Sequence, residues 1–152
     1  MDAMDADSLG SELVEVAIAI LYRDNQFLMQ LRDDIPGIAY PGHWGFFGGH
    51  LDPGETPEVA MRRELLEEIG YAPSVITPFR RYPTDKVVRH VFHAPLRVGL
   101  EDLTLSEGWD MDFLSIEDVR AGQRHSRRAA KTCPVGAPHR QILLDFFKSA
   151  PA

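Results

Sequence analysis

The segment from Gly49 to Tyr71, GHLDPGETPEVAMRRELLEEIGY, constrains the fold of this chain more than any other part of it. It joins a glycine-rich turn to a stretch that carries both start and stop signals of a helix. Thr56 is a good N-cap, Pro57 suits the first helical position, and Gly70 is typical of a helix C-terminus. The segment therefore predicts a tight turn followed directly by a helix between Thr56 and Gly70.

Three carboxylates share one face of this predicted helix. Glu64, Glu67 and Glu68 stand at positions i, i+3 and i+4, so their side chains project together. Like charges placed in this way repel one another, and a cation among them would offset the cost. Magnesium is the usual oxygen-liganded cation where phosphate is the substrate. The alternative is a solvated acidic face, partly neutralised by Arg62 and Arg63, but it explains neither the glycine turn nor the other spacings.

The whole segment resembles the Nudix box. Gly49, five residues, Glu55, seven residues and then RELLEEIGY from Arg63 repeat the family pattern at every charged and glycine position. The one departure is Tyr71, where the family usually has Ile, Leu or Val. The resemblance implies an α+β protein with the Nudix fold, an α/β/α sandwich around a mixed sheet.

The resemblance also implies roles for residues in and near the box. The carbonyl of Gly48 would join the three helix glutamates as a metal ligand, with Mg²⁺ as the cofactor and Mn²⁺ as the alternative. Arg63 is expected to pair with Glu55, because a guanidinium fork suits a carboxylate better than lysine does. Glu107, in LSEGWD, is either a catalytic base outside the box or a plain loop glutamate. The candidate catalytic set is Glu55, Arg63, Glu64, Glu67, Glu68 and Glu107.

Hydrolysis of a pyrophosphate bond is the reaction that the resemblance implies. Metal ions would neutralise the oxygens of a diphosphate joined to a group X, and an activated water would attack phosphorus. The products would be a nucleoside monophosphate and phosphorylated X. Nucleoside triphosphates, nucleotide sugars and ADP-ribose all stay open as substrates. The alternative function is a nucleotide-sensing domain without catalysis, although such domains usually lose box carboxylates.

Substrate-binding residues are harder to identify. Arg32, at the end of a predicted strand, could reach a phosphate, while Trp44, Tyr82 and Trp109 could stack on a base or belong to the core. The basic run between residues 120 and 131 is interpreted as a solvated loop, with a phosphate clamp as the alternative. The histidines show no zinc-type spacing.

Composition limits the class of protein and its partners. A formal net charge of −7 disfavours general binding of nucleic acid. Cys133 is the one cysteine, which excludes an internal disulfide and a cysteine zinc site. No apolar run approaches the roughly 18 residues of a membrane span, and the N-terminus lacks a signal pattern. A cytoplasmic protein without membrane contact is expected, and the resemblance leaves a homodimer open.

The expected domain organisation is an acidic, disordered leader over residues 1–12 and a single Nudix domain over residues 13–150. Apolar contacts of the box helix are expected from Val59, Leu65, Leu66 and Ile69. Strands are predicted over residues 13–22, 26–32, 43–50, 73–82, 86–98 and 111–116, with a turn at 23–25, a loop at 33–42, and helices at 117–122 and 140–149.

Overall fold

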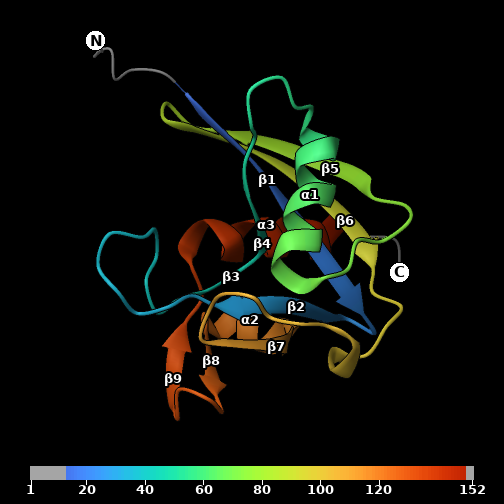
Figure 1. Cartoon of the computed structure of the whole chain (residues 1–152). Helices are drawn as coiled ribbons and strands as arrows, with labels where there is room; N and C mark the ends of the chain where they lie inside the picture. The colour runs from blue at the N-terminus through green and yellow to red at the C-terminus, as the bar shows by residue number, and fades with distance from the viewer. Residues whose placement is uncertain (1–12, 150–152) are drawn as a thin grey trace.

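The computed structural model describes residues 13–149, so the predicted leader lies outside the described residues. A seven-stranded mixed sheet lies between one helix in front and two helices behind (Figure 1). This arrangement confirms the predicted α+β class and the α/β/α sandwich.

The strands and helices follow the predicted order along the chain. The helices are α1 (Pro57–Ile69), α2 (Ile116–Ala121) and α3 (Ala137–Ser149), with a short 3₁₀ turn η1 (Leu100–Asp102). The strands are β1 (Val14–Arg23), β2 (Gln26–Leu31), β3 (Trp44–Gly45), β4 (Phe47–His50), β5 (Thr77–Pro83), β6 (Val87–Pro95), β7 (Asp110–Ser115), β8 (Gln123–Ser126) and β9 (Lys131–Pro134).

Strand β1 is the centre of the sheet. It pairs parallel with β6 and antiparallel with β2 and β4, and the main path runs β3-β2-β1-β6-β5, with β7 added beside β2. The predicted turn after β1 is present, and Asp24 and Asn25 have φ angles of 52° and 64°. Two consecutive positive φ values match the twist of a tight hairpin, and Asn and Asp tolerate them well.

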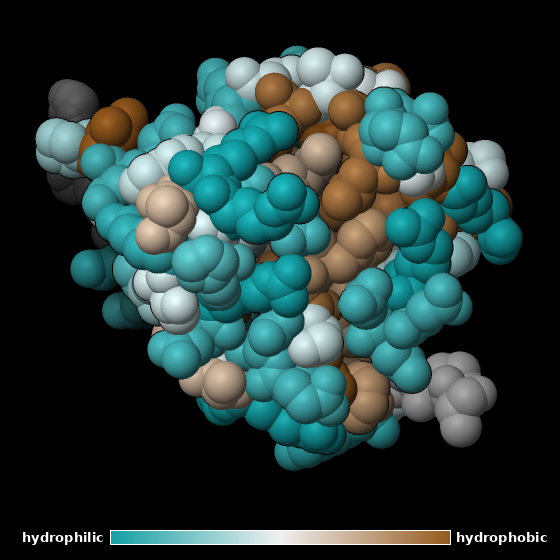
Figure 2. Space-filling model, turned by 90° about the horizontal axis from the view of Figure 1, so that it is seen from below, coloured by the Kyte–Doolittle hydropathy of each residue, from teal (hydrophilic) through white to brown (hydrophobic). Residues whose placement is uncertain are grey.

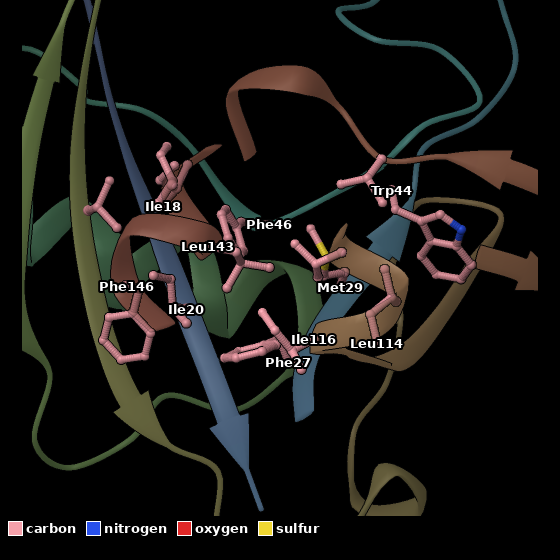
Figure 3. Packing of buried hydrophobic residues seen from close by; sticks show 14 of the residues in the cluster. Ile18, Ile20, Phe27, Met29, Trp44, Phe46, Leu114, Ile116, Leu143 and Phe146 are labelled. Atoms are coloured by element: carbon pink, nitrogen blue, oxygen red, sulfur yellow. The ribbon is translucent and has the colours of Figure 1, made fainter. Parts of the chain in front are cut away.

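The alternation of side chains along β1 divides the interior into two cores. Ile18 and Ile20 face α2 and α3, whereas Ala17, Ala19 and Leu21 face α1. Figure 3 shows the first core, where Phe27, Met29 and Leu143 pack around the β1 isoleucines. The two small alanines on the other face leave room for α1 to lie close to the sheet.

Helix α1 begins and ends where the sequence predicts. The Thr56 hydroxyl accepts a hydrogen bond from the Val59 N–H at 3.2 Å, and Gly70 caps the other end with a φ of 70°. The prediction of its apolar contacts was half wrong, because Val59 and Leu66 are 53% and 57% exposed. The core face of α1 is filled instead by Ala60, which is smaller, and by Met61, which is more flexible. The buried residues of α1 are Ala60, Met61, Leu65 and Ile69.

Three further predictions need correction. The stretch from 43 to 50 forms two strands rather than one, because β3 pairs with β2 and β4 with β1. The basic run after α2 is not a solvated loop but the β8–β9 hairpin, paired from Gln123 to Pro134. Helix α3 starts at Ala137, earlier than the predicted 140.

Most of the surface seen from below is hydrophilic, and hydrophobic surface gathers in one strip on this face (Figure 2). Among the helices of residues 13–149, none combines the length and the apolar character that crossing a membrane requires.

Candidate metal and phosphate site

The turn between β4 and α1 brings the backbone within reach of the helix carboxylates. Gly48 has a φ of 148°, and a β-carbon there would collide with the carbonyl oxygen of Ala17. At Gly49 an added β-carbon would lie 2.6 Å from Cδ of Glu64. Glycine is therefore required at both positions, at Gly48 for the strand pairing and at Gly49 for the seat of a carboxylate.

Arg63 binds the predicted partner Glu55 through a two-pronged fork. Its Nε donates to Glu55 Oε2 at 2.7 Å and its Nη2 to Glu55 Oε1 at 2.9 Å, while Nη2 also donates to the His50 carbonyl at 3.1 Å. Its third nitrogen, Nη1, donates to Glu64 Oε2 at 3.0 Å and to Glu67 Oε1 at 3.2 Å. One guanidinium thus connects the box carboxylates to the end of β4.

Asp52 belongs to the same cluster, although the sequence analysis did not single it out. Its carboxylate lies 3.4 Å from the Arg63 Nε, and its N–H donates to Glu55 Oε1 at 2.8 Å. The Asp-Pro-Gly sequence that begins at Asp52 is a typical turn, and this turn was the sequence signal that could have identified Asp52. The bonds from Arg63 and from the Asp52 N–H hold the pKa of Glu55 at about 2, so this carboxylate stays charged.

Glu68 is a half-buried carboxylate that lies against the glycine turn. Its Oε1 accepts a hydrogen bond from the Gly48 N–H at 2.9 Å. Burial raises its pKa to about 8, and the negative charges of Glu64 and Glu107 act in the same direction, against the Gly48 bond and the positive charge of Arg32. The surroundings of Glu68 therefore disfavour its ionised form.

The loop that carries Glu107 is fixed against this end of α1. The Ser106 N–H donates to the Glu68 carbonyl at 3.0 Å, and the Trp109 N–H donates to the Leu31 carbonyl at 2.8 Å. Glu107 is thereby held between the end of α1 and the end of β2. The structure brings this predicted residue to the box carboxylates, and its catalytic role stays a prediction.

Arg32, which directly follows β2, is the cation on this side of the site. Its charge lowers the pKa of Glu68, and within residues 13–149 its Nε is buried without a hydrogen-bond partner. Buried donors are normally satisfied, so this unpaired nitrogen makes Arg32 a candidate for binding an anionic group.

The structure contradicts the prediction that Trp44 stacks on a substrate base. Trp44 is fully buried in the core behind the sheet (Figure 3), and its Nε1 donates to the Arg124 carbonyl at 3.0 Å. Tyr82 packs against that same core, opposite α1, and its hydroxyl donates to Asp145 at 2.8 Å. The structure does not bring it to the carboxylates, so its binding role stays a prediction. The Lys131 ammonium lies over Trp109, 5.1 Å from the centroid of the Trp109 ring.

The basic residues of the β8–β9 hairpin are largely engaged in ion pairs. Arg124 binds Asp112 and Asp118 at 2.9 Å each, and Lys131 lies 3.9 Å from Asp34. The Arg124 pairs attach the hairpin to β7 and α2, and the Lys131 pair attaches it to the loop between β2 and β3. The positive charge of these two residues is thus mostly compensated. This arrangement gives the phosphate clamp little support.

The donor set fits a hard divalent cation, although the side chains do not yet converge on one point. Within residues 13–149 no three acidic, histidine or cysteine side chains lie close enough together to hold a metal. The carboxylates have different partners, since Glu67 accepts a hydrogen bond from Arg63 and Glu68 accepts one from the Gly48 N–H. All the donors are oxygens, as Mg²⁺ prefers, and Glu64 and Glu68 already lie against the glycine turn.

A separate hollow of about 630 Å³ lies at the start of α1. It is bordered by the first turn of the helix and by β5 and β6, and none of the box carboxylates from Glu64 onward lines it. The carboxylate cluster is thus distinct from this hollow.

Comparison with known proteins finds a matching family model and several similar proteins. A family model described as "NUDIX domain" matches residues 12–133. A CTP pyrophosphohydrolase of Escherichia coli K12 is 32% identical over 88 residues, which are 55% of this chain and 64% of that protein. An RNA pyrophosphohydrolase of Aeromonas hydrophila is 48% identical over 63 residues, 41% of this chain and 32% of that protein. The chain thus spans less than two thirds of the length of these curated relatives.

Solved structures show the same fold. A MutT structure from work on Aliivibrio salmonicida and Vibrio cholerae matches with a TM-score of 0.71 at 20% identity, covering 91% of this chain and 100% of that one. The NUDIX domain of Shewanella oneidensis NrtR, complexed with ADP ribose, matches with a TM-score of 0.68 at 17% identity, covering 95% and 92%. At these identities the likeness establishes the fold alone.

Proposed function

The chain belongs to the Nudix family, and from this we propose that it is a metal-dependent pyrophosphohydrolase that acts on nucleotides. It would cleave a nucleoside diphosphate linked to a group X into a nucleoside monophosphate and phosphorylated X. The observation that carries the proposal is the complete box in its folded geometry. The Arg63–Glu55 fork anchors α1 to the glycine turn, and Glu64 and Glu68 lie against Gly48 and Gly49.

We assign the metal to the oxygens of the glycine turn and the helix, with Mg²⁺ as the cation and Mn²⁺ as its substitute. The donors are the Gly48 carbonyl and the carboxylates of Glu64, Glu67 and Glu68. When bound, a divalent cation neutralises phosphate oxygens and makes a water molecule more acidic. Burial is the main cause that raises the pKa of Glu68 to about 8, and the negative charges of Glu64 and Glu107 add to it. A cation bound there would favour the ionised carboxylate, which supports this assignment.

Glu107 is our candidate for the residue that takes the proton from the attacking water. It acts electrostatically on Glu68, and within the described residues it forms no ion pair. A carboxylate that is not committed to Arg63 or to the glycine turn is free to accept a proton. Glu68 is the alternative base inside the box.

Arg32 is our candidate for the phosphate-binding cation. Its buried Nε has no hydrogen-bond partner in the described part of the chain, and its charge reaches the carboxylate cluster. A phosphate oxygen bound there would lie beside the proposed metal site, and charge-assisted hydrogen bonds of this kind are strong.

Nucleoside triphosphates are the substrate class that we favour. The curated relatives include a CTP pyrophosphohydrolase and a nucleoside triphosphatase from Escherichia coli, the latter 36% identical over 55 residues. An RNA end, as the name of the Aeromonas relative indicates for that protein, fits less well because a net charge of −7 repels a polyanion. A homodimer stays a prediction.

A nucleotide sensor without catalysis is the second candidate. One solved domain with this fold is a complex with ADP ribose, so the fold can bind a nucleotide, as a sensor requires, although an enzyme requires this as well. The retention of Glu55, Glu64, Glu67 and Glu68 argues against it, since a sensor has no need of a full set of metal-binding carboxylates.

Product analysis on a nucleotide panel tests the proposal. Purified protein would be incubated with the common nucleoside triphosphates, a nucleotide sugar and ADP-ribose, each with Mg²⁺, with Mn²⁺ and with a chelator. We expect a nucleoside monophosphate as the product, formed only with metal. Binding of a nucleotide without any turnover would support the sensor instead, and release of nucleoside diphosphate would contradict the assigned bond cleavage.

A further inference from the structure

The two ends of the Arg63 guanidinium make contacts of different kinds. Nε and Nη2 are committed to Glu55 and to the His50 carbonyl at 2.7 to 3.1 Å. Nη1 lies between the carboxylates of Glu64 and Glu67 at 3.0 and 3.2 Å. Nη1 therefore occupies the position of a cation between two of the three proposed metal ligands.

Glu64 and Glu67 differ in how firmly they are held. The Glu64 side chain is 16% exposed and lies against Gly49, whereas the Glu67 side chain is 59% exposed. Within the described residues the hydrogen bond from Arg63 Nη1 is the one polar side-chain contact of Glu67. Exposed ion pairs four residues apart on a helix are weak, so Glu67 can leave Arg63 at little cost.

We propose that Arg63 Nη1 substitutes for the metal in the metal-free protein, and that Glu67 changes partner from Arg63 to the metal when the metal binds. Glu64 and Glu68 keep their places against the Gly48–Gly49 turn, and the fork to Glu55 stays closed. This inference rests on the metal site of the proposed function. It explains why the three carboxylates carry the ligand spacing without converging in the structure.

The direction in which metal affinity changes when Nη1 is removed separates competition with the metal from simple positioning of the carboxylates. If Arg63 competes with the metal for Glu67, then removal of Nη1 makes metal binding tighter. If Arg63 only positions the carboxylates for the metal, then its removal makes metal binding weaker. Turnover falls in either case, because catalysis needs the aligned helix, so turnover does not discriminate.

The test compares the dissociation constant for Mn²⁺ in three proteins, which are the wild type, Arg63→Lys and Arg62→Lys. It is measured by calorimetry and by the electron paramagnetic resonance signal of free Mn²⁺, without nucleotide and at low ionic strength. Lysine keeps the charge but cannot bind Glu55 with a fork and reach Glu67 together. We expect binding about two- to fivefold tighter in Arg63→Lys, the range that follows from losing weak exposed pairs. Arg62 contacts Glu58 and the carbonyls of Pro73 and Ser74, so Arg62→Lys should bind like the wild type.

A second measurement uses the wild type alone and so does not depend on the folding of a variant. The ¹⁵N resonances of the Arg63 guanidinium are followed during a Mg²⁺ titration. We expect Nη1 to shift and to rotate faster, while the Nε–H of the fork stays protected from exchange.

The outcomes separate the two proposals. Weaker or equal Mn²⁺ binding in a folded Arg63→Lys variant, or an Nη1 signal that Mg²⁺ leaves unchanged, overturns the change of partner and leaves the metal site standing. Absence of Mn²⁺ and Mg²⁺ binding in the wild type overturns the metal site itself, and the change of partner with it.

Discussion

At the scale of single residues, Glu68 illustrates how one carboxylate can serve chemistry at the expense of stability. Burial and the neighbouring charges raise its pKa to about 8, so at neutral pH the metal-free protein gains nothing from ionising it. Among the residues that the structure describes, its one hydrogen-bond donor is the Gly48 N–H at 2.9 Å. A group so placed is explained by a ligand that the protein must bind, which agrees with the proposed metal site.

Replacement of Glu68 by glutamine should separate activity from folding. Glu68→Gln keeps the volume and an oxygen for the Gly48 N–H but removes the charge, so we expect turnover to fall by roughly two to four orders of magnitude. The melting temperature without metal should stay equal or rise, because at neutral pH folding no longer has to protonate a carboxyl that the unfolded chain leaves ionised. Turnover and melting temperature are measured on the same preparation of the protein. Glu58→Gln, on the first turn of α1 and outside the cluster, is the matched control, and wild-type turnover in Glu68→Gln would refute the ligand role.

At the scale of elements, the junction of β4 and α1 assigns different duties to two adjacent glycines. A β-carbon at Gly48 meets backbone, whereas a β-carbon at Gly49 meets the carboxylate of Glu64. Backbone cannot give way without disturbing the pairing of β1 with β4, but a side chain can rotate. The two positions therefore predict different defects.

Alanine substitutions at the two positions should show this difference. We expect Gly48→Ala to lower the free energy of unfolding by about 1–3 kcal/mol or more, because strain at positive φ adds to the collision with Ala17. Gly49→Ala should cost less stability but should displace Glu64 and lower turnover at least tenfold, an effect of the order seen when a catalytic group is misplaced. Chemical denaturation and turnover of both variants check this. Equal loss of stability in the two variants would contradict the assignment.

The β8–β9 hairpin is a second element whose position depends on a few polar contacts. Arg124 binds Asp112 of β7 and Asp118 of α2 at 2.9 Å each. Burial lowers the pKa of Arg124, but the two carboxylates outweigh it, and the net effect is a raised pKa. Its backbone carbonyl also accepts the Trp44 indole N–H. The hairpin is thus attached to the core behind the sheet rather than free to clamp a substrate.

Loss of the Arg124 side chain should weaken this attachment. We expect Arg124→Ala to lower the free energy of unfolding by about 1–2 kcal/mol, because two half-buried carboxylates lose their partner. Urea denaturation gives the value. Arg127→Ala on the same hairpin removes an exposed side chain that has no ion pair within residues 13–149, and it should change stability by less than about 0.5 kcal/mol. A similar loss in both variants would mean that the ion pairs do not hold the hairpin.

At the scale of the whole molecule, local signals were predictable from the sequence and long-range contacts were not. The caps of α1, the turn at Asp24 and Asn25, and the Arg63–Glu55 pair follow from rules that act over a few residues. Trp44 was misassigned because its burial depends on the distant β8 strand and α2, which no local pattern reveals. The hairpin of β8 and β9 was missed because its charged residues are neutralised by partners far along the chain.

His139 ties distant parts of the molecule together and makes its stability depend on pH. It is carried by α3, and its Nδ1 accepts a hydrogen bond from the Phe46 N–H at 3.1 Å, a bond that requires the neutral ring. The residue as a whole is half-buried, and burial of the ring together with the charges of Arg89 and Arg32 lowers its pKa to about 3. The unfolded chain, with an ordinary pKa of 6.5, therefore takes up this proton first as the pH falls.

The sign of the pH effect follows from that difference. The contribution of neutral His139 is complete above pH 6.5 and declines as the pH falls from 6.5 toward 3, by at most about 1.4 kcal/mol per pH unit. His139→Asn keeps an acceptor for the Phe46 N–H but cannot be protonated. Between pH 7 and 4.5 the wild type should therefore lose about 1–3 kcal/mol more stability than His139→Asn, measured by urea denaturation at several pH values. The exposed His125, changed to asparagine, should leave the wild-type slope unchanged, and parallel curves for the wild type and His139→Asn would show that this histidine does not control acid stability.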